Sequence, residues 1–123
     1  MSRVRSANTT PEIALRAILH RLGYGYRLHV KKLAGKPDVV FPSRHKVIFV
    51  HGCFWHRHRC KLGTPIPATR QGFWMAKLLR NKQRDKIVRQ RLRKENWDVL
   101  VVWECHTRDM KKMIETLKLF FDG

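Results

Sequence analysis

The segment from His51 to Cys60 reads HGCFWHRHRC and concentrates side chains that bind metals or transfer protons. Cys53, His58 and Cys60 form a C-x4-H-x-C pattern, and thiolate and imidazole are the groups that coordinate zinc in proteins. Three ligands leave a tetrahedral structural site one short, and Cys105, at the end of a predicted strand, is placed to supply a fourth. The alternative is a set of ordinary reduced thiols beside a surface histidine. We expect zinc, which would hold an irregular loop in shape.

A second set of residues has the chemistry of phosphodiester hydrolysis. Asp38 starts a predicted hairpin strand, and His51 and His56 flank the zinc loop at the far end of the next strand. A carboxylate at such a position binds Mg²⁺, which polarises a phosphate and activates water, and histidine is a suitable general base near neutral pH. Two other interpretations stay open, because Pro-Asp is common in turns and Glu12 is an acid favoured at a helix start.

Adjacent aromatic residues form a third feature of the same loop. Phe54 and Trp55 lie between a predicted zinc ligand and the candidate base, and Trp74 follows after a Gly- and Pro-bearing connection. Large aromatic side chains beside basic ones are suited to stacking on bases or wedging between base pairs. The alternative is that one of the pair packs into the core.

The charge of the chain indicates the partner. Twenty-seven lysines and arginines stand against nine acidic residues, a formal net charge of +18 in 123 residues. Such an excess repels itself unless a polyanion binds, and nucleic acid is the usual one. No apolar run approaches the roughly 20 residues of a spanning helix, no signal peptide is visible, and three cysteines fit a reducing compartment. We expect a soluble, cytoplasmic, nucleoid-associated protein with no membrane partner.

Apolar periodicity predicts the elements that must position these residues. A Thr-Pro-Glu start at 10–12, followed by helical spacing and a glycine, predicts a helix over 11–22. Alternation at Tyr26, Leu28 and Val30 predicts a strand. The apolar runs PDVVF and KVIFVHG, separated by PSRH, predict an antiparallel hairpin.

The longest predicted helix covers about 73–96. Six of its residues recur every three or four positions and so share one stripe, namely Trp74, Leu78, Asn81, Asp85, Val88 and Leu92. Two polar residues interrupt this inward face. The other faces carry basic residues, Lys77, Arg80, Lys82, Arg84, Arg89 and Arg91. We expect these to follow DNA phosphates, with a merely solvated surface as the alternative.

The C-terminal segments complete the fold prediction. The near-continuous apolar run WDVLVVWE predicts a buried central strand ending at Cys105, and a helix over 109–121 closes the core. The order α-β-β-β-α-β-α predicts an α/β protein with a mixed central sheet flanked by helices. The length predicts a single domain over 1–123, with residues 1–10 as a basic N-terminal arm.

Taken together, the motifs resemble a known family. KPDVVF, VIFVHGCFWHRHRC, PATRQGFWMAK, NKQRD and VLVVWEC, in this order and spacing, are similar to the very short patch repair endonucleases, which nick DNA at mismatches and have a fold like that of type II restriction enzymes. The resemblance extends from about Met1 to Cys105. Its most specific part is HGCFWH-x-H-x-C.

The resemblance implies roles for the catalytic and metal-binding residues. Asp38 matches the family's essential Mg²⁺-binding aspartate and His56 the base that activates water, with Glu12 and His51 as the supporting acid and histidine. Where a family member has Thr, this chain has Val50, and the family uses the backbone carbonyl of that residue on the metal. The four predicted zinc ligands match the family's structural zinc site: Cys53, His58, Cys60 and Cys105.

The resemblance also implies the DNA contacts. Phe54, Trp55 and Trp74 match aromatics that intercalate beside the mismatch, and Met1 matches a methionine that wedges in from the minor groove. Lys77 and Asn81 match side chains that read the T:G pair. A polar Asn81 on an apolar stripe agrees with that role.

The sequence therefore predicts a Mg²⁺-dependent endonuclease with structural Zn²⁺ that nicks one strand of duplex DNA 5′ of the thymine of a T:G mismatch. Such an enzyme repairs deaminated 5-methylcytosine. One alternative keeps the fold and chemistry as a site-specific or homing-type nuclease domain. Another is a non-catalytic, zinc-stabilised DNA-binding module. We expect a monomer, because the target is asymmetric, with mismatch-repair proteins as further partners.

Overall fold

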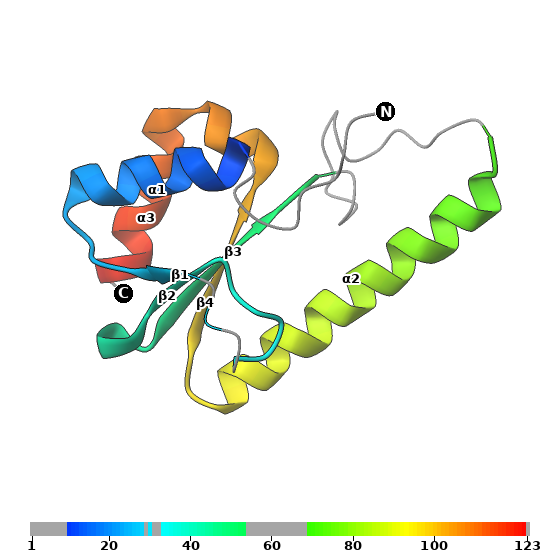
Figure 1. Ribbon diagram of the computed structural model, residues 1–123, viewed down its shortest axis with the longest axis horizontal. Coiled ribbons are helices and arrows are strands. Elements are labelled where there is room, and N and C mark those ends of the chain that lie inside the picture. Colours follow the sequence, from blue (N-terminus) through cyan, green and yellow to red (C-terminus); the bar gives the residue numbers. More distant parts are fainter. Residues whose placement is uncertain (1–9, 29, 31–32, 54–68, 123) are drawn as a thin grey trace.

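The computed structural model describes residues 10–28, 30, 33–53 and 69–122, in which helices flank a sheet of strands (Figure 1). The elements are α1 (Thr10–Leu22), β1 (Arg27–Leu28), β2 (Val39–Phe41), the 3-10 helix η1 (Pro42–Arg44), β3 (Lys46–His51), α2 (Gln71–Lys94), β4 (Asp98–Trp103), the 3-10 helix η2 (Glu104–Arg108) and α3 (Met110–Asp122). The order of helices and strands expected from the sequence is confirmed.

The strands form one mixed sheet in the order β1-β2-β3-β4. β1 pairs antiparallel with β2, and β2 and β3 form the predicted antiparallel hairpin, in which Val39 lies opposite Ile48. β3 and β4 run parallel. Because parallel strands share a direction, the segments that follow them emerge at the same end of the sheet.

The expectation for β4 was wrong in one respect, because it is an edge strand of the described sheet and not a central one. Its apolar sequence has a different cause. Val99 and Val101 pack against the cluster that contains Leu92 of α2, whereas Leu100 and Val102 pack on the side of α1 and α3. Helices therefore cover both faces of this edge strand, so both faces need apolar residues. The strand also ends at Trp103, which places Cys105 in η2.

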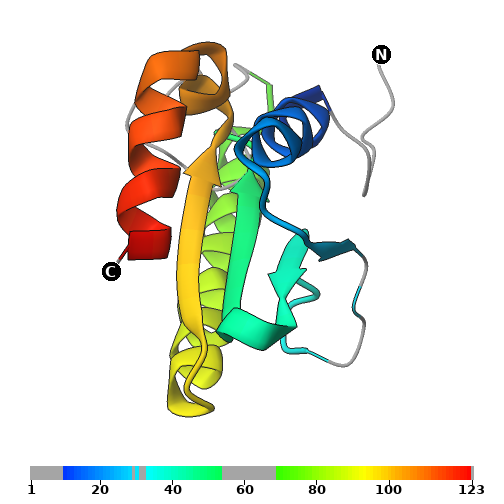
Figure 2. The same ribbon diagram turned by 90° about the vertical axis from the view of Figure 1, so that its left-hand side faces the viewer.

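Two apolar clusters, one on each face of the sheet, hold the fold together. Val39, Phe41 and Ile48 face a cluster completed by α1 and α3, and Val40 and Val47 face the cluster under α2. The alternation follows from the two-residue period of a strand. Figure 2 shows α1 and α3 on one side of the strands and α2 on the other.

The inward stripe predicted for α2 is present. Leu78 and Leu92 are fully buried, and the other four stripe residues are half-buried. Gly35 allows a loop to pack directly on this helix, because a Cβ at this glycine would lie 2.4 Å from Cγ1 of Val88. The helix also brings Asp85, one of its two polar stripe residues, to the end of β3.

Two further expectations concern the N-terminal arm and membrane-spanning helices. α1 begins at Thr10, so the predicted arm overlaps the helix by one residue, and positions 1–9 lie outside the described residues. In the part of the chain that the structure describes, no helix is both long and apolar enough to cross a membrane.

Candidate active site

A cavity of about 350 Å³ opens where β3 ends, between the loop before β2 and the inner face of α2. Asp38, Val50, His51 and Asp85 are among the residues that line it. The hairpin explains part of this arrangement, since an antiparallel register places the start of β2 beside the end of β3. Three residues predicted for the site are thus brought together by β2 and β3.

Asp38 is held between a hydrogen-bond donor and a second acid. The backbone N–H of Val50 donates to Oδ2 of Asp38 at 2.6 Å, and the buried Glu12 side chain shares a hydrogen bond with Asp38. Burial raises the pKa of Asp38 from its ordinary value of 3.8 to about 7, and the negative charge of Glu12 adds to the rise. The Val50 N–H and the nearby Arg16 act in the opposite direction. This carboxyl group therefore changes charge near neutral pH.

Arg16 supplies a positive charge beside this acid pair. Its Nη2 lies 3.1 Å from Oε2 of Glu12, one helical turn earlier in α1, and the two side chains are only 18% and 7% exposed. A guanidinium in such a place stabilises the ionised form of the carboxylates around it. Arg16 was not among the residues predicted for the site.

His51 is buried at the last position of β3 and faces α2. Its Nδ1 lies 4.0 Å from Oδ2 of Asp85, and its ring meets Trp103 edge-on with centres 5.2 Å apart. A separation of 4.0 Å is too long for a hydrogen bond, so the Asp85 carboxylate acts on the imidazole ring through its charge. Asp85 was predicted to lie on the inward stripe but was given no role. The signal was present in the sequence, as an acid on an apolar stripe.

The first and last predicted zinc ligands lie together at the same end of the sheet. The backbone N–H of Cys105 donates to Sγ of the buried Cys53 at 3.4 Å, and the N–H of Cys53 donates to Oε1 of Glu104 at 3.2 Å. A thiol with an N–H donor at its sulfur, opposite a second cysteine, fits a thiolate metal site. Within the described ranges, no three His, Cys, Asp or Glu side chains gather as a metal site.

The remaining predicted residues divide between α2 and segments that are not described. Trp74, Lys77 and Asn81 are half-buried on the first part of α2, with Nζ of Lys77 6.0 Å from the centre of the Trp74 ring. The structure does not place these three in the lining of the cavity. The others lie outside the described residues: Met1, Phe54, Trp55, His56, His58 and Cys60.

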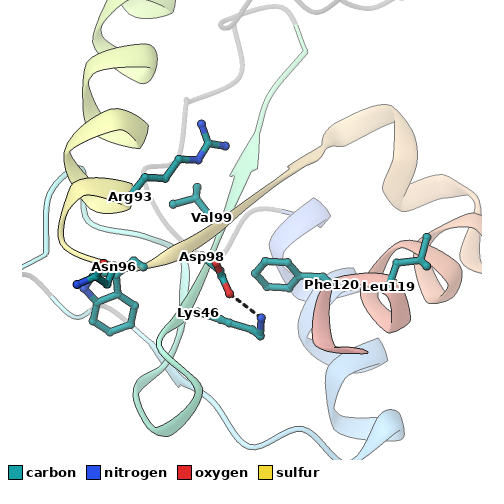
Figure 3. Close-up of a pocket in the computed structure, with 8 residues that line it drawn as sticks. Lys46, Arg93, Asn96, Asp98, Val99, Leu119 and Phe120 are labelled. Atoms are coloured by element: carbon teal, nitrogen blue, oxygen red, sulfur yellow. Dashed lines mark hydrogen bonds and ion pairs between the residues drawn. The ribbon is translucent and has the colours of Figure 1, made fainter. Parts of the chain in front are cut away.

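A larger cavity, about 580 Å³, lies at the opposite ends of β3 and β4 (Figure 3). Its lining includes Lys46, Asp98, Trp97 and Phe120. Nζ of Lys46 donates to Oδ2 of Asp98 at 2.8 Å and lies 4.8 Å from the centre of the Phe120 ring. Among the described residues that line it, the one acid is thus paired with a cation, and there is no second acid or histidine. This cavity therefore lacks the groups for acid–base or metal chemistry.

Comparison with known proteins gives a consistent result. The family model described as DNA mismatch endonuclease Vsr matches residues 1–62. The Type II nicking enzyme V.XorIIP of Xanthomonas oryzae pv. oryzae is 47% identical over 122 residues, which covers 99% of this chain and 89% of that protein. The DNA mismatch endonuclease Vsr of Escherichia coli is 39% identical over 115 residues, covering 94% and 73%. The Type II nicking enzyme V.NmeAIP of Neisseria meningitidis is 38% identical over 109 residues, covering 89% and 77%.

The mixed sheet, the acidic site at the end of β3 and these similarities define an endonuclease. Within that class, the chain belongs to the DNA mismatch endonuclease Vsr family. The resemblance found from the motifs alone is confirmed.

Proposed function

We propose that the protein is a Mg²⁺-dependent endonuclease that nicks one strand of duplex DNA on the 5′ side of the thymine of a T:G mismatch. It would restore sites at which 5-methylcytosine has been deaminated. The observation that carries this proposal is that Asp38, which contacts the buried acid Glu12, lines one cavity together with His51. Two acids in contact repel each other when both are ionised, and a divalent cation removes that penalty.

The residues present fit a magnesium ion. Asp38 and the backbone carbonyl of Val50 would hold it, with Glu12 as the supporting acid, because Mg²⁺ prefers oxygen ligands. When bound, the ion polarises the phosphate and stabilises the charge that develops on its oxygens. His51, the supporting histidine of the proposed site, lies beside Asp85 on the wall of the same cavity.

The proposed reaction is hydrolysis of one phosphodiester bond. His56 takes a proton from the attacking water, whose oxygen bonds to phosphorus while the bond from phosphorus to O3′ breaks. The O3′ atom leaves with the bonding electron pair and takes a proton from solvent, which gives a 3′-hydroxyl and a 5′-phosphate. This role for His56 rests on the motif, because the residue lies outside the described part of the chain.

Mismatch selectivity is proposed for α2 and the HGCFWH loop. Trp74 and Asn81 lie on the inward stripe of α2, and the half-buried Lys77 lies beside that stripe with its Nζ 6.0 Å from the centre of the Trp74 ring. An amide and an ammonium read base edges by hydrogen bonds, and aromatics fill the gap at an unstacked step. Phe54, Trp55 and Met1 are proposed to complete this wedge.

Structural zinc is proposed for Cys53, His58, Cys60 and Cys105. The support is the approach of Cys53 to Cys105 across two segments that are distant in sequence. Cys105→Ser should lower the zinc content from one ion per chain and lower the thermal midpoint, measured by metal analysis and calorimetry. One zinc per chain with unchanged stability would remove Cys105 from the ligand set.

The test of function is a strand-resolved cleavage assay with Mg²⁺ on two duplexes that differ only in T:G against C:G. We expect a single nick in the thymine strand of the mismatched duplex. Equal cutting of both duplexes would indicate a site-specific nuclease, and binding without cutting would indicate a non-catalytic module. We further propose a monomer that acts inside the cell near DNA, with mismatch-repair proteins as partners, and sedimentation of the complex tests the stoichiometry.

A further inference from the structure

We infer that Lys36 and Arg84 form a phosphate clamp at the cavity, binding two backbone phosphates of the DNA close to the bond that is cut. The inference rests on the proposed function and assigns two DNA-binding residues to the same site. Both side chains line the cavity that contains Asp38 and His51, Lys36 from the loop before β2 and Arg84 from α2. Both residues are exposed.

The loop conformation fixes the first cation. Lys36 has a φ of 50°, in the left-handed region, where a residue other than glycine loses roughly 1 kcal/mol. It stands between Gly35 and the buried Pro37, and its N–H donates to the carbonyl of Leu33 at 3.2 Å. Left-handed lysine is unusual at a position where glycine would fit without strain. We therefore infer that lysine is present at this position for its charged side chain.

The packing of the loop on α2 brings the second cation close. Gly35 lies so near Val88 that a methyl group would not fit between them, and Val88 is one helical turn after Arg84. The two cations thus reach one cavity from different elements across a tight contact. Of the basic residues on α2, Arg84 is the one that lines this cavity.

The acidic residues at the cavity explain why a phosphodiester needs cations to bind there. Asp38 and Asp85 line the wall and Glu12 contacts Asp38, so an approaching phosphodiester meets negative charge. Within the described residues, neither Lys36 nor Arg84 lies within ion-pair distance of an acid. Their charges therefore remain available to an anion, and phosphate is the anion that the proposed substrate brings.

The test is the salt dependence of binding to a matched duplex, measured by fluorescence anisotropy with EDTA present. Each phosphate contact contributes about 0.9 to the slope of log K against log salt concentration. We expect K36Q and R84Q each to reduce the slope by about 0.9, and the double variant by about 1.8. Between about 50 and 200 mM salt, the loss of affinity should then be about 3.5-fold smaller for each cation removed.

Three further variants separate contacts made at the cavity from a general effect of net charge. Lys118→Gln removes the same charge from an exposed site on α3, across the sheet, and should leave the slope unchanged. Lys36→Gly should reduce the slope as K36Q does while the thermal midpoint stays the same or rises, because the left-handed strain is relieved. Arg84→Lys should keep the slope.

Equal slopes for K36Q, R84Q and the unsubstituted protein would overturn the clamp, as would an equal decrease in K118Q. The binding assay needs no cleavage, so it is separate from the test of the proposed function. A chain that fails to nick but shows the expected slopes would keep the clamp and lose the mismatch endonuclease. A chain that nicks with unchanged slopes would do the reverse.

Discussion

The two ends of the β3–β4 pair carry the two cavities, and the comparison separates a packing feature from a chemical one. At the amino ends, Lys46 and Asp98 neutralise each other at 2.8 Å, and 67% of the Asp98 side chain is exposed. At the carboxyl ends, Asp38 lies against a second acid and is largely removed from water. The larger cavity is the chemically quiet one. A carboxyl group whose pKa is raised by burial and by a neighbouring acid marks a candidate active site. The volume of a cavity does not.

The largest expected effect separates the two aspartates. Asp38→Asn removes the carboxylate proposed to hold Mg²⁺, so nicking should fall by about a thousand-fold, since such charge stabilisation is worth several kcal/mol. Asp98→Asn changes the same group at the opposite end and should leave the rate within about two-fold. Single-turnover nicking of the T:G duplex measures both. Similar losses in the two variants would mean that the two ends do not differ in their chemistry.

The next effect concerns the counter-ion at the acid pair. Arg16→Met removes one partner of a mostly buried ion pair and leaves Glu12 and Asp38 without that cation, a loss of about 3–5 kcal/mol for pairs of this kind. We expect a lower denaturation midpoint and a weaker response to Mg²⁺. Arg16→Lys should restore most of both. A Met variant as stable and as active as the parent would show that Arg16 is not needed as a counter-ion for the acid pair.

The pH dependence of stability should report the raised pKa of Asp38. The folded-state pKa of Asp38, about 7, lies above its ordinary value of 3.8, so its contribution to stability is complete below pH 3.8 and is lost as the pH rises to about 7. In EDTA, Asp38→Asn should therefore become more stable than the parent over that window, with a constant difference above pH 7. Nicking at subsaturating Mg²⁺ should rise through pH 7 as the carboxyl ionises. A constant difference from pH 4 to 8 would show that Asp38 does not titrate near neutral pH.

The smallest effect is expected at the amino ends of β3 and β4, where Lys46 pairs with Asp98. Lys46→Met removes the ammonium group, and with it both the ion pair with Asp98 and the cation–π contact with Phe120, so the free energy of unfolding should fall by no more than about 2 kcal/mol. Urea titration measures the change. Nicking by this variant should equal that of the parent, and a marked loss would link the two ends of the strands.

Much of this arrangement could be predicted, because it follows from strand pairing and from the periodicity of apolar residues in the sequence. The antiparallel pairing of the hairpin places Asp38 beside the end of β3, and the helical period places Asn81 and Asp85 on the inward stripe. β4 was misplaced because an apolar run reports covered faces, and it does not report how many edges are paired. Arg16 was missed because, although its spacing of four residues from Glu12 is visible in the sequence, the burial of the pair beside Asp38 is not.

The parallel pairing of β3 with β4 also bears on the order in which the site assembles. Asp38 and Val50 are 12 residues apart and meet within one hairpin, whereas Cys53 and Cys105 are 52 residues apart and meet only after the long segment between β3 and β4 has closed. Local contacts form before distant ones, because closing a longer loop costs more chain entropy. We therefore expect the contact between Asp38 and Val50 to form early in folding and the contact between Cys53 and Cys105 to form late.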